Sequence, residues 1–254
     1  MKTTRAEVEG YFNRIAKSYS RKYSRDDTFL YYFFNERLAE ATRGVDLGDK
    51  RVLDIGAGTG NLYDHLRTLN STCDYYAVDI AADMLENSNI PADRQFVGEV
   101  GRIELPHNEF DLMFLLGVTT YFGDERLEEM LDWMSNNLSC GGSAIITFTN
   151  RSSLDWKSRR IFRFFGKRLL PKRFVLAQDF VVFPRSVDQV RAIIGSRFDV
   201  VDLRWLNHTV FPLNQLFKGL SVMLARKIHE IGAGRRLMGA ISSDFLLVLR
   251  KSDQ

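Results

Sequence analysis

The sequence predicts an α/β fold, in which helices cover both faces of a mostly parallel sheet of seven strands. Three observations lead to this prediction. From Arg51 onward, short apolar segments alternate with segments whose apolar residues have helical spacing. The apolar segments are rich in Leu, Ile, Val and Phe, as in strands that are buried on both sides. A glycine-rich turn follows the first of them, and strands that alternate with helices imply βαβ units.

The elements can be placed in order along the chain. The expected strands are residues 51–56, 75–80, 95–100, 110–117, 143–150, 198–207 and 244–251. The helices expected between them are residues 61–69, 81–88, 124–139 and 186–196. Helical spacing also occurs outside this alternation, at residues 28–42 and 214–232. We therefore expect a core sheet that carries helical additions.

Composition excludes several classes of protein. The chain has 254 residues, 45% of them hydrophobic, which argues against disorder. No apolar run approaches the roughly 20 residues of a membrane span, and residues 1–20 lack the apolar core of a signal peptide. Cys73 and Cys140 have the spacing of neither a zinc site nor a redox pair. We expect free thiols in a cytoplasmic protein.

Charge is distributed unevenly along the chain, although the formal net charge is only +3. Residues 51–150 hold 5 Arg and 16 acidic residues, a net charge of −11. Residues 151–254 hold 20 basic and 8 acidic residues, a net charge of +12. Such asymmetry indicates an anionic partner for the second half.

The first predicted strand ends in a turn typical of nucleotide sites. Gly56, Gly58 and Gly60 give a G-x-G-x-G spacing, preceded by Asp54 within the strand. Bare backbone lets a ligand approach closely, and the following helix offers free N–H groups. Asp79 ends the second strand, 19 residues after Gly60, where an acid can accept both ribose hydroxyls of an adenosine.

These motifs resemble those of class I S-adenosylmethionine-dependent methyltransferases of the small-molecule type. "VLDIGAGTG" is similar to their first motif, Asp79 to the acid of their second, and "FVGEV" to their G-D-A segment, with Glu99 in place of Asp. "FDLMFLLGVTTYF" and "SCGGSAIITF" resemble the motifs around the fourth and fifth strands. The resemblance covers residues 8–150 well and implies a Rossmann-like, doubly wound sheet with an antiparallel last strand.

The resemblance also implies a division of one domain, residues 1–254. Its parts are an N-terminal helical cap (1–48), a cofactor-binding core (49–150), a basic lid insertion (151–185), further core (186–207), a second helical insertion (208–242) and a last strand (243–254). The three additions are expected to converge over the methyl donor, because ligands of such sheets bind beyond the carboxyl ends of the strands.

The resemblance assigns roles in binding S-adenosylmethionine by position. The implied cofactor-binding residues are Tyr11, Tyr19, Asp54, Gly56, Ala57, Gly58, Asp79, Ile80, Met84, Glu99, Val100 and Leu116. The glycine turn would face the methionine part, Asp54 its ammonium and Asp79 the ribose. Glu99 and the Val100 N–H would recognise the adenine edge, and the two tyrosines would cover the carboxylate end.

Methyl transfer requires alignment of the nucleophile with the methyl carbon and sulfur, and exclusion of water. A base assists when the nucleophile is a hydroxyl. His208 and Tyr121 are the candidate catalytic residues, because each follows a predicted strand at the substrate edge. The sequence shows no cluster with metal-ligand spacing, so no metal is expected.

The sequence of the basic lid insertion is compatible with more than one class of methyl acceptor. Its helical wheel groups Arg160, Arg163 and Lys167 on one face and Ile161, Phe162, Phe165 and Leu169 on the other. This pattern fits a lid over the substrate, peripheral contact of residues 156–173 with an anionic membrane, or contact with RNA.

We expect transfer to an oxygen of a small or lipid-linked molecule. An RNA methyltransferase is an alternative, although "LLGVTTYF" lacks the N/D-P-P-Y/F motif of many base-amine enzymes. Two further alternatives are a regulatory protein that binds S-adenosylmethionine without turnover and a nicotinamide-dependent dehydrogenase. The G-x-G-x-G spacing argues against the dehydrogenase.

Overall fold

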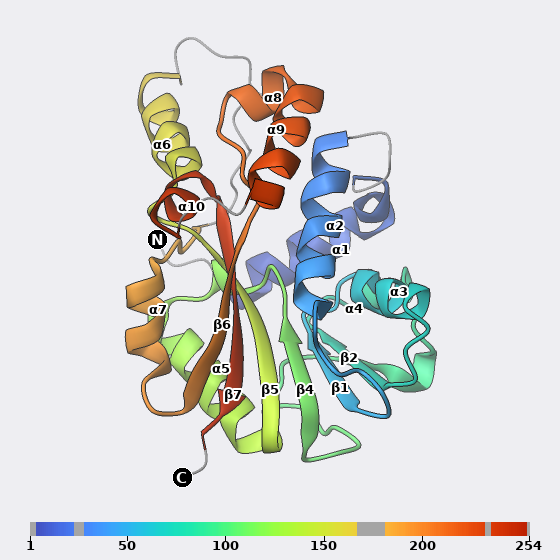
Figure 1. The fold of residues 1–254 in the computed structure, drawn as a ribbon. Helices are drawn as coiled ribbons and strands as arrows, with labels where there is room; N and C mark the ends of the chain where they lie inside the picture. Colours follow the sequence, from blue (N-terminus) through green and yellow to red (C-terminus); the bar gives the residue numbers. More distant parts are fainter. Residues whose placement is uncertain (1–3, 23–27, 167–180, 232–234, 253–254) are drawn as a thin grey trace.

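A seven-stranded sheet forms the centre of the molecule (Figure 1). The computed structural model describes residues 4–22, 28–166, 181–231 and 235–252. The strands are β1 (Arg51–Ile55), β2 (Asp74–Asp79), β3 (Gln95–Val97), β4 (Phe110–Leu115), β5 (Leu138–Thr149), β6 (Phe198–Leu206) and β7 (Asp244–Lys251). Their order is β3-β2-β1-β4-β5-β7-β6, and only β7 runs antiparallel to its neighbours. The predicted α/β fold with an antiparallel last strand is confirmed.

Helices pack on both faces of the sheet. They are α2 (Thr28–Thr42), α3 (Asn61–Thr68) and α4 (Ala82–Glu86) on one face, and α5 (Asp124–Asn137) and α7 (Val187–Ile194) on the other. Successive strand residues point to opposite faces, so Val52 packs in the cluster of Leu62 on α3, whereas Leu53 packs in the cluster of Leu127 on α5. Burial on both faces explains why the central strands are mostly apolar.

Several predicted boundaries shift by one to three residues, and two elements differ more clearly from their predicted form. β5 begins at Leu138 rather than at residue 143, because α5 ends at Asn137 and the chain enters the strand directly. The helix predicted at residues 214–232 is divided into α8 (Leu213–Leu216) and α9 (Lys218–Ile231). Phe217 separates them, with φ −129° and ψ 62°, outside the helical region. α10 (Arg235–Ile241) then leads to β7.

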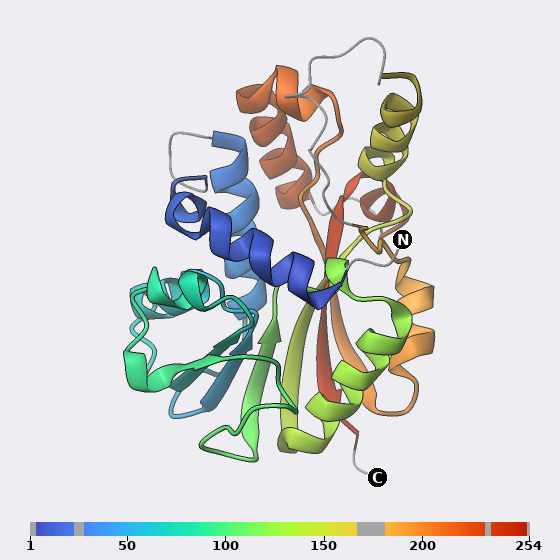
Figure 2. The same cartoon turned by 180° about the vertical axis from the view of Figure 1, so that it is seen from behind.

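The helices outside the alternating pattern gather at the carboxyl ends of the parallel strands. They are α1 (Arg5–Lys22), α2, α6 (Leu154–Gly166), α8, α9 and α10, and both views place them at this end of the sheet (Figures 1 and 2). Phe29 and Tyr32 of α2 pack against Val222 and Ala225 of α9. α2 and the second insertion therefore share a small core of their own, apart from the sheet.

In the described part of the chain, no helix has the length and apolar character needed to cross a membrane.

Candidate functional site

A cavity of about 520 Å³ opens at the carboxyl ends of the strands. Its walls come from the turn after β1, the ends of β2 and β4, and all three helical additions. This volume lies within the usual range of small-molecule sites. The size and position of the cavity therefore suit a small-molecule ligand at the predicted site.

The turn after β1 has the close backbone packing that its glycines predict. Gly56 has φ +77°, and a Cβ atom there would lie 2.3 Å from Cγ2 of Val118. The N–H groups of Gly56 and Ala57 both donate to the carbonyl of Val78, at 2.7 and 3.1 Å. A side chain at Gly56 would thus be strained and would collide with Val118, so this position requires glycine.

Asp79 joins the glycine turn to the start of α4. Its Oδ2 accepts from the Gly58 N–H at 2.8 Å, and its Oδ1 accepts from the Ala81 N–H at 2.9 Å. Burial raises the pKa of Asp79, while these backbone donors act in the opposite direction. Each carboxylate oxygen has two acceptor sites, so further donors can bind here.

Asp54 is the second acid at the cavity, and it is almost fully buried at 3% exposure. The Tyr75 hydroxyl donates to its Oδ2 at 2.6 Å. Burial raises the pKa of Asp54 to about 7, although the Tyr75 hydrogen bond lowers it. The carboxyl group can therefore exchange a proton near neutral pH, and a cation beside it would favour the charged form.

Glu99 has partners that the sequence did not indicate. Its Oε1 accepts from Arg126 at 2.9 Å, and its Oε2 lies 3.2 Å from both Arg5 and Arg102. Arg5 belongs to α1, so this ion pair fastens the N-terminal helix over the cavity. These guanidinium groups would compete with an adenine amine for the Glu99 carboxylate. Glu99, which stands where the family motif has Asp, is the residue that makes these arginine contacts.

The structure places twelve of the fourteen predicted site residues in the cavity wall. They are Tyr19, Gly56, Ala57, Gly58, Ile80, Met84, Val100, Leu116 and Tyr121, together with the acids already described.

Tyr11 and His208 do not line the cavity. The ring of Tyr11 instead meets the edge of Phe12, which does line it. His208 is buried at 4% exposure, its Nδ1 lies 2.8 Å from the Ser242 hydroxyl, and burial lowers its pKa to about 4. His208 therefore does not meet the requirement that a base reach the substrate.

Sequence reasoning missed the far wall of the cavity, which combines aromatic and charged side chains. Its aromatic members are Phe29, Phe33, Phe34, Phe148 and Trp156. Arg37 lies 3.9 Å from Asp244, and Arg159 donates to Asp155 at 2.6 Å. Burial raises the pKa of Asp244, and Arg37 opposes this shift. These residues come from α2, the end of β5, α6 and the start of β7, so only the folded chain brings them together.

Three more residues come together just outside the cavity wall. Glu36, His208 and His229 each offer one metal-ligating atom, and these atoms all lie within 4.8 Å of one another. The sequence predicted no such cluster, because 172 positions separate Glu36 from His208.

One family model matches the core of the chain. Residues 52–142 match the model of the family described as "Methyltransferase domain". No curated protein sequence matches the chain.

Solved structures share the fold over almost the whole chain. Magnesium protoporphyrin IX methyltransferase from Synechocystis, with bound SAH, has a TM-score of 0.62 at 14% identity and covers 97% of this chain and 99% of its own. A possible histamine N-methyltransferase from Thermotoga maritima has the same TM-score and identity and covers 96% and 99%. Phosphoethanolamine N-methyltransferase 1 from Haemonchus contortus has a TM-score of 0.63 at 14% identity and covers 99% and 50%.

Proposed function

We propose that this chain, an S-adenosylmethionine-dependent methyltransferase with the class I fold, methylates a hydroxyl oxygen of a small and largely apolar or lipid-linked molecule. One observation supports this function above the others. A single cavity joins the glycine turn and acids of the cofactor half to a wall of aromatic side chains. The first half suits the methyl donor, and the second suits an apolar acceptor.

The residues of the first half fit the cofactor. The Gly56 position admits no side chain, so a ligand can approach the bare backbone there. Asp79 would accept from the ribose hydroxyls, and Ile80 and Met84 would pack on the adenine. Asp54 would balance the ammonium group, through water, since a carboxyl with a pKa of about 7 ionises readily beside a cation.

Bound S-adenosylmethionine supplies a methyl group on a sulfonium, whose carbon–sulfur bond breaks as the acceptor oxygen forms the new carbon–oxygen bond. The chain must then exclude water, align the acceptor and remove the hydroxyl proton. Phe33, Phe148 and Trp156 would exclude water around the acceptor.

Asp244 is better placed than His208 to take the hydroxyl proton. It lines the cavity at 8% exposure, and burial raises its pKa, which makes it a stronger base than an exposed aspartate. Tyr121 also lines the cavity and would orient the acceptor. The proton passes from the acceptor hydroxyl to the Asp244 carboxylate, and Arg37 at 3.9 Å holds that carboxylate in place.

The outer surface of the helical additions supports an acceptor that comes from a membrane. Leu213, Leu216, Phe217 and Leu220 of the α8–α9 region are 52–57% exposed, and Ile161 of α6 is 58% exposed. Both helical regions lie at the same end of the molecule (Figures 1 and 2). We call these five residues the docking patch. All five residues belong to residues 151–254, which carry a net charge of +12, and positive charge favours contact with anionic lipid.

The proposed membrane contact differs from the one predicted from sequence, which was residues 156–173. Residues 167–173, with Lys167 and Leu169, lie outside the described residues, and Arg159 is held by Asp155 and lies 4.9 Å from the ring of Phe211. Ile161 and Phe162, predicted on the apolar face of this segment, are 58% and 37% exposed. The patch that we propose is therefore larger than α6 and is centred on α8 and α9.

A labelling experiment tests the proposed function. The protein is incubated with cell extract and S-adenosylmethionine carrying a labelled methyl group, and the label is divided among organic, aqueous and acid-precipitable fractions. We expect label in the organic fraction that Asp79→Ala abolishes. Label confined to a nuclease-sensitive precipitate would contradict the proposal in favour of the RNA alternative.

A further inference from the structure

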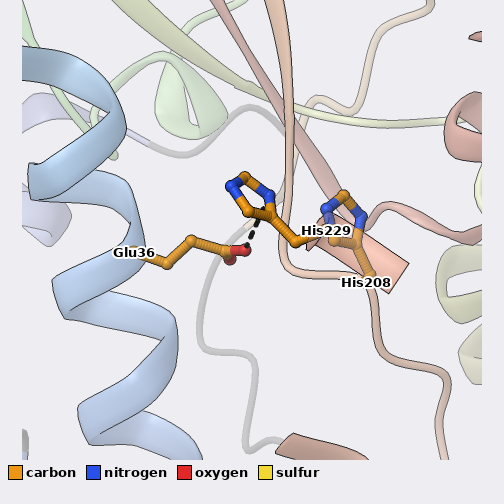
Figure 3. A group of neighbouring side chains, drawn as sticks. All are labelled: Glu36, His208 and His229. Atoms are coloured by element: carbon orange, nitrogen blue, oxygen red, sulfur yellow. Dashed lines mark ion pairs between the residues drawn. The ribbon is translucent and has the colours of Figure 1, made fainter. Parts of the chain in front are cut away.

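A cluster of ionisable side chains lies where α2, the end of β6 and α9 meet, beside the cavity but outside its lining. Glu36 and Glu40 belong to α2, His208 follows β6, and His229 belongs to α9. Figure 3 shows the His229 imidazole between the Glu36 carboxylate and the His208 imidazole. The two imidazole rings are stacked, with their centroids 5.7 Å apart. Three segments distant in the sequence thus bring nitrogen and oxygen donors to one point.

The hydrogen bonds of Ser242 determine which nitrogen of His208 carries the proton. The Ser242 hydroxyl donates its single hydrogen to the Met238 carbonyl at 2.6 Å, so it accepts from Nδ1 of His208 at 2.8 Å. Nε2 of His208 is then an acceptor with a free lone pair. Within the part of the chain that the structure describes, this buried atom has no hydrogen-bond partner. A buried acceptor without a partner is unfavourable, and a metal ion would satisfy it.

The other potential ligands are also oriented by their neighbours. Glu36 accepts from the Tyr32 hydroxyl and from the Asn207 N–H, both at 2.7 Å. Nδ1 of His229 lies 3.9 Å from Glu36, and its Nε2 lies 3.4 Å from Glu40. Metal-binding histidines commonly have a carboxylate on their second nitrogen, and metal-binding carboxylates are commonly hydrogen-bonded in turn.

We propose that Glu36, Nε2 of His208 and Nδ1 of His229 bind a divalent transition-metal ion of the zinc class. Two imidazoles and one carboxylate form a donor set that zinc prefers, whereas Mg²⁺ and Ca²⁺ prefer oxygen alone. Ligand atoms of a tetrahedral zinc ion stand about 3.3 Å apart, given bonds of about 2.0 Å. The three ligand atoms lie within 4.8 Å of one another, so small side-chain movements on binding would bring them to this spacing. The His229 side chain is 42% exposed and has room for such a movement.

The ion would fasten α2 to the second insertion. Asn207, next to His208, lines the cavity, and so do Phe33 and Arg37 on the helix of Glu36. A metal bond between α2, α9 and the end of β6 therefore fixes the acceptor side of the cavity. This structural role goes beyond the proposed methyl transfer and does not depend on it.

Zinc titration of the full chain tests the proposal. The protein, freed of metal by a chelator and with Cys73 and Cys140 replaced by serine, is titrated with Zn²⁺ by calorimetry. We expect one Zn²⁺ per chain. His229→Ala removes an exposed ligand and should weaken zinc binding by tenfold or more, and Glu40→Gln should weaken it about 10–100-fold. His107→Ala, a histidine beside Tyr76 and remote from the cluster, should bind zinc as the parent chain does.

Melting curves provide the second measurement. Zinc should raise the melting temperature of the parent chain and of His107→Ala but not of His229→Ala. Absence of zinc binding, or a loss smaller than tenfold in His229→Ala, would overturn the proposal. Titration of S-adenosylmethionine in the same samples shows whether each variant is folded, and it keeps a failed metal site distinct from a failed methyltransferase.

Discussion

At the scale of single residues, Asp54 combines deep burial with a position at the cofactor half of the cavity. Its folded pKa of about 7 lies well above its ordinary value of 3.8. Between these two values, the folded chain holds a proton that the unfolded chain has already released. The free energy of unfolding therefore falls as pH rises from about 4 to 7, since the unfolded state binds fewer protons there.

Asp54→Asn should remove this contribution. Relative to the variant, the wild-type chain without cofactor should lose about 3 kcal/mol of stability between pH 5 and pH 8, at about 1.4 kcal/mol per pH unit within the window. Denaturant unfolding at both pH values measures the difference. Asp54→Asn should also bind S-adenosylmethionine more weakly, because the ammonium loses its counter-charge. A parallel pH dependence in the two proteins would contradict the assigned burial effect.

Residues of the cofactor half could be predicted from sequence more readily than those of the acceptor half. Asp54 and Asp79 lie at strand ends beside a glycine turn, so strand order alone brings them together. His208 also follows a strand, yet its side chain turns toward Ser242 and His229 instead of the cavity. Side-chain direction after a strand end depends on packing with distant helices, which no local pattern contains.

At the scale of elements, Arg185 fastens the return of the basic lid insertion to the core. Its side chain is 4% exposed and donates to the Phe122 carbonyl at 2.6 Å, to the Thr119 carbonyl at 3.3 Å and to Asp124 at 2.8 Å. Its backbone N–H donates to the Thr149 carbonyl at the end of β5. Arg185 thus contacts β5 through its backbone, and its buried guanidinium joins the turn after β4 to the start of α5.

Arg185→Met should be strongly destabilising, because it leaves two buried carbonyl groups without this donor. The expected cost is about 3 kcal/mol, which lowers the melting temperature by roughly 6–12 °C in a chain of this size. Arg191→Met, on the exposed face of α7, is the matched control and should change the melting temperature by less than about 2 °C. Equal melting temperatures in the two variants would show that Arg185 does not hold the insertion.

The helical additions were predictable as helices but not as walls of one site. Helical spacing identified residues 28–42 correctly, because apolar positions recur along α2. The division at Phe217 was not predictable, since residues 214–232 contain no proline and keep helical spacing throughout. Contacts between α2 and α9, such as Tyr32 with Val222, depend on how two separate insertions fold over the same sheet edge.

At the scale of the whole molecule, positive charge and exposed apolar side chains occur together in residues 151–254. The negative net charge belongs to residues 51–150, which form the cofactor-binding core. This division predicts a preferred orientation on an anionic membrane, with the docking patch toward the lipid and the cavity beneath it.

Replacing Leu216, Phe217 and Leu220 of the docking patch with glutamine should weaken binding to anionic vesicles by at least about tenfold, because each side chain loses apolar contact with lipid. Sedimentation with phosphatidylserine-containing vesicles measures the binding. Leu69→Gln with Val201→Gln changes equally exposed apolar residues remote from the patch and should bind vesicles normally. Unchanged sedimentation of the triple variant would contradict membrane binding through the docking patch.

Recognition of S-adenosylmethionine by Asp79 is the basis of the proposed function, and calorimetric titration of the cofactor tests it. Asp74 and Asp79 lie at opposite ends of β2, so Asp74→Ala is the matched control for Asp79→Ala. We predict one S-adenosylmethionine per wild-type chain, about 100-fold weaker binding to Asp79→Ala from the loss of two hydrogen bonds to a charged group, and unchanged binding to Asp74→Ala. Absence of binding to the wild-type chain, or equal binding to Asp79→Ala with its fold intact, would contradict the central claim.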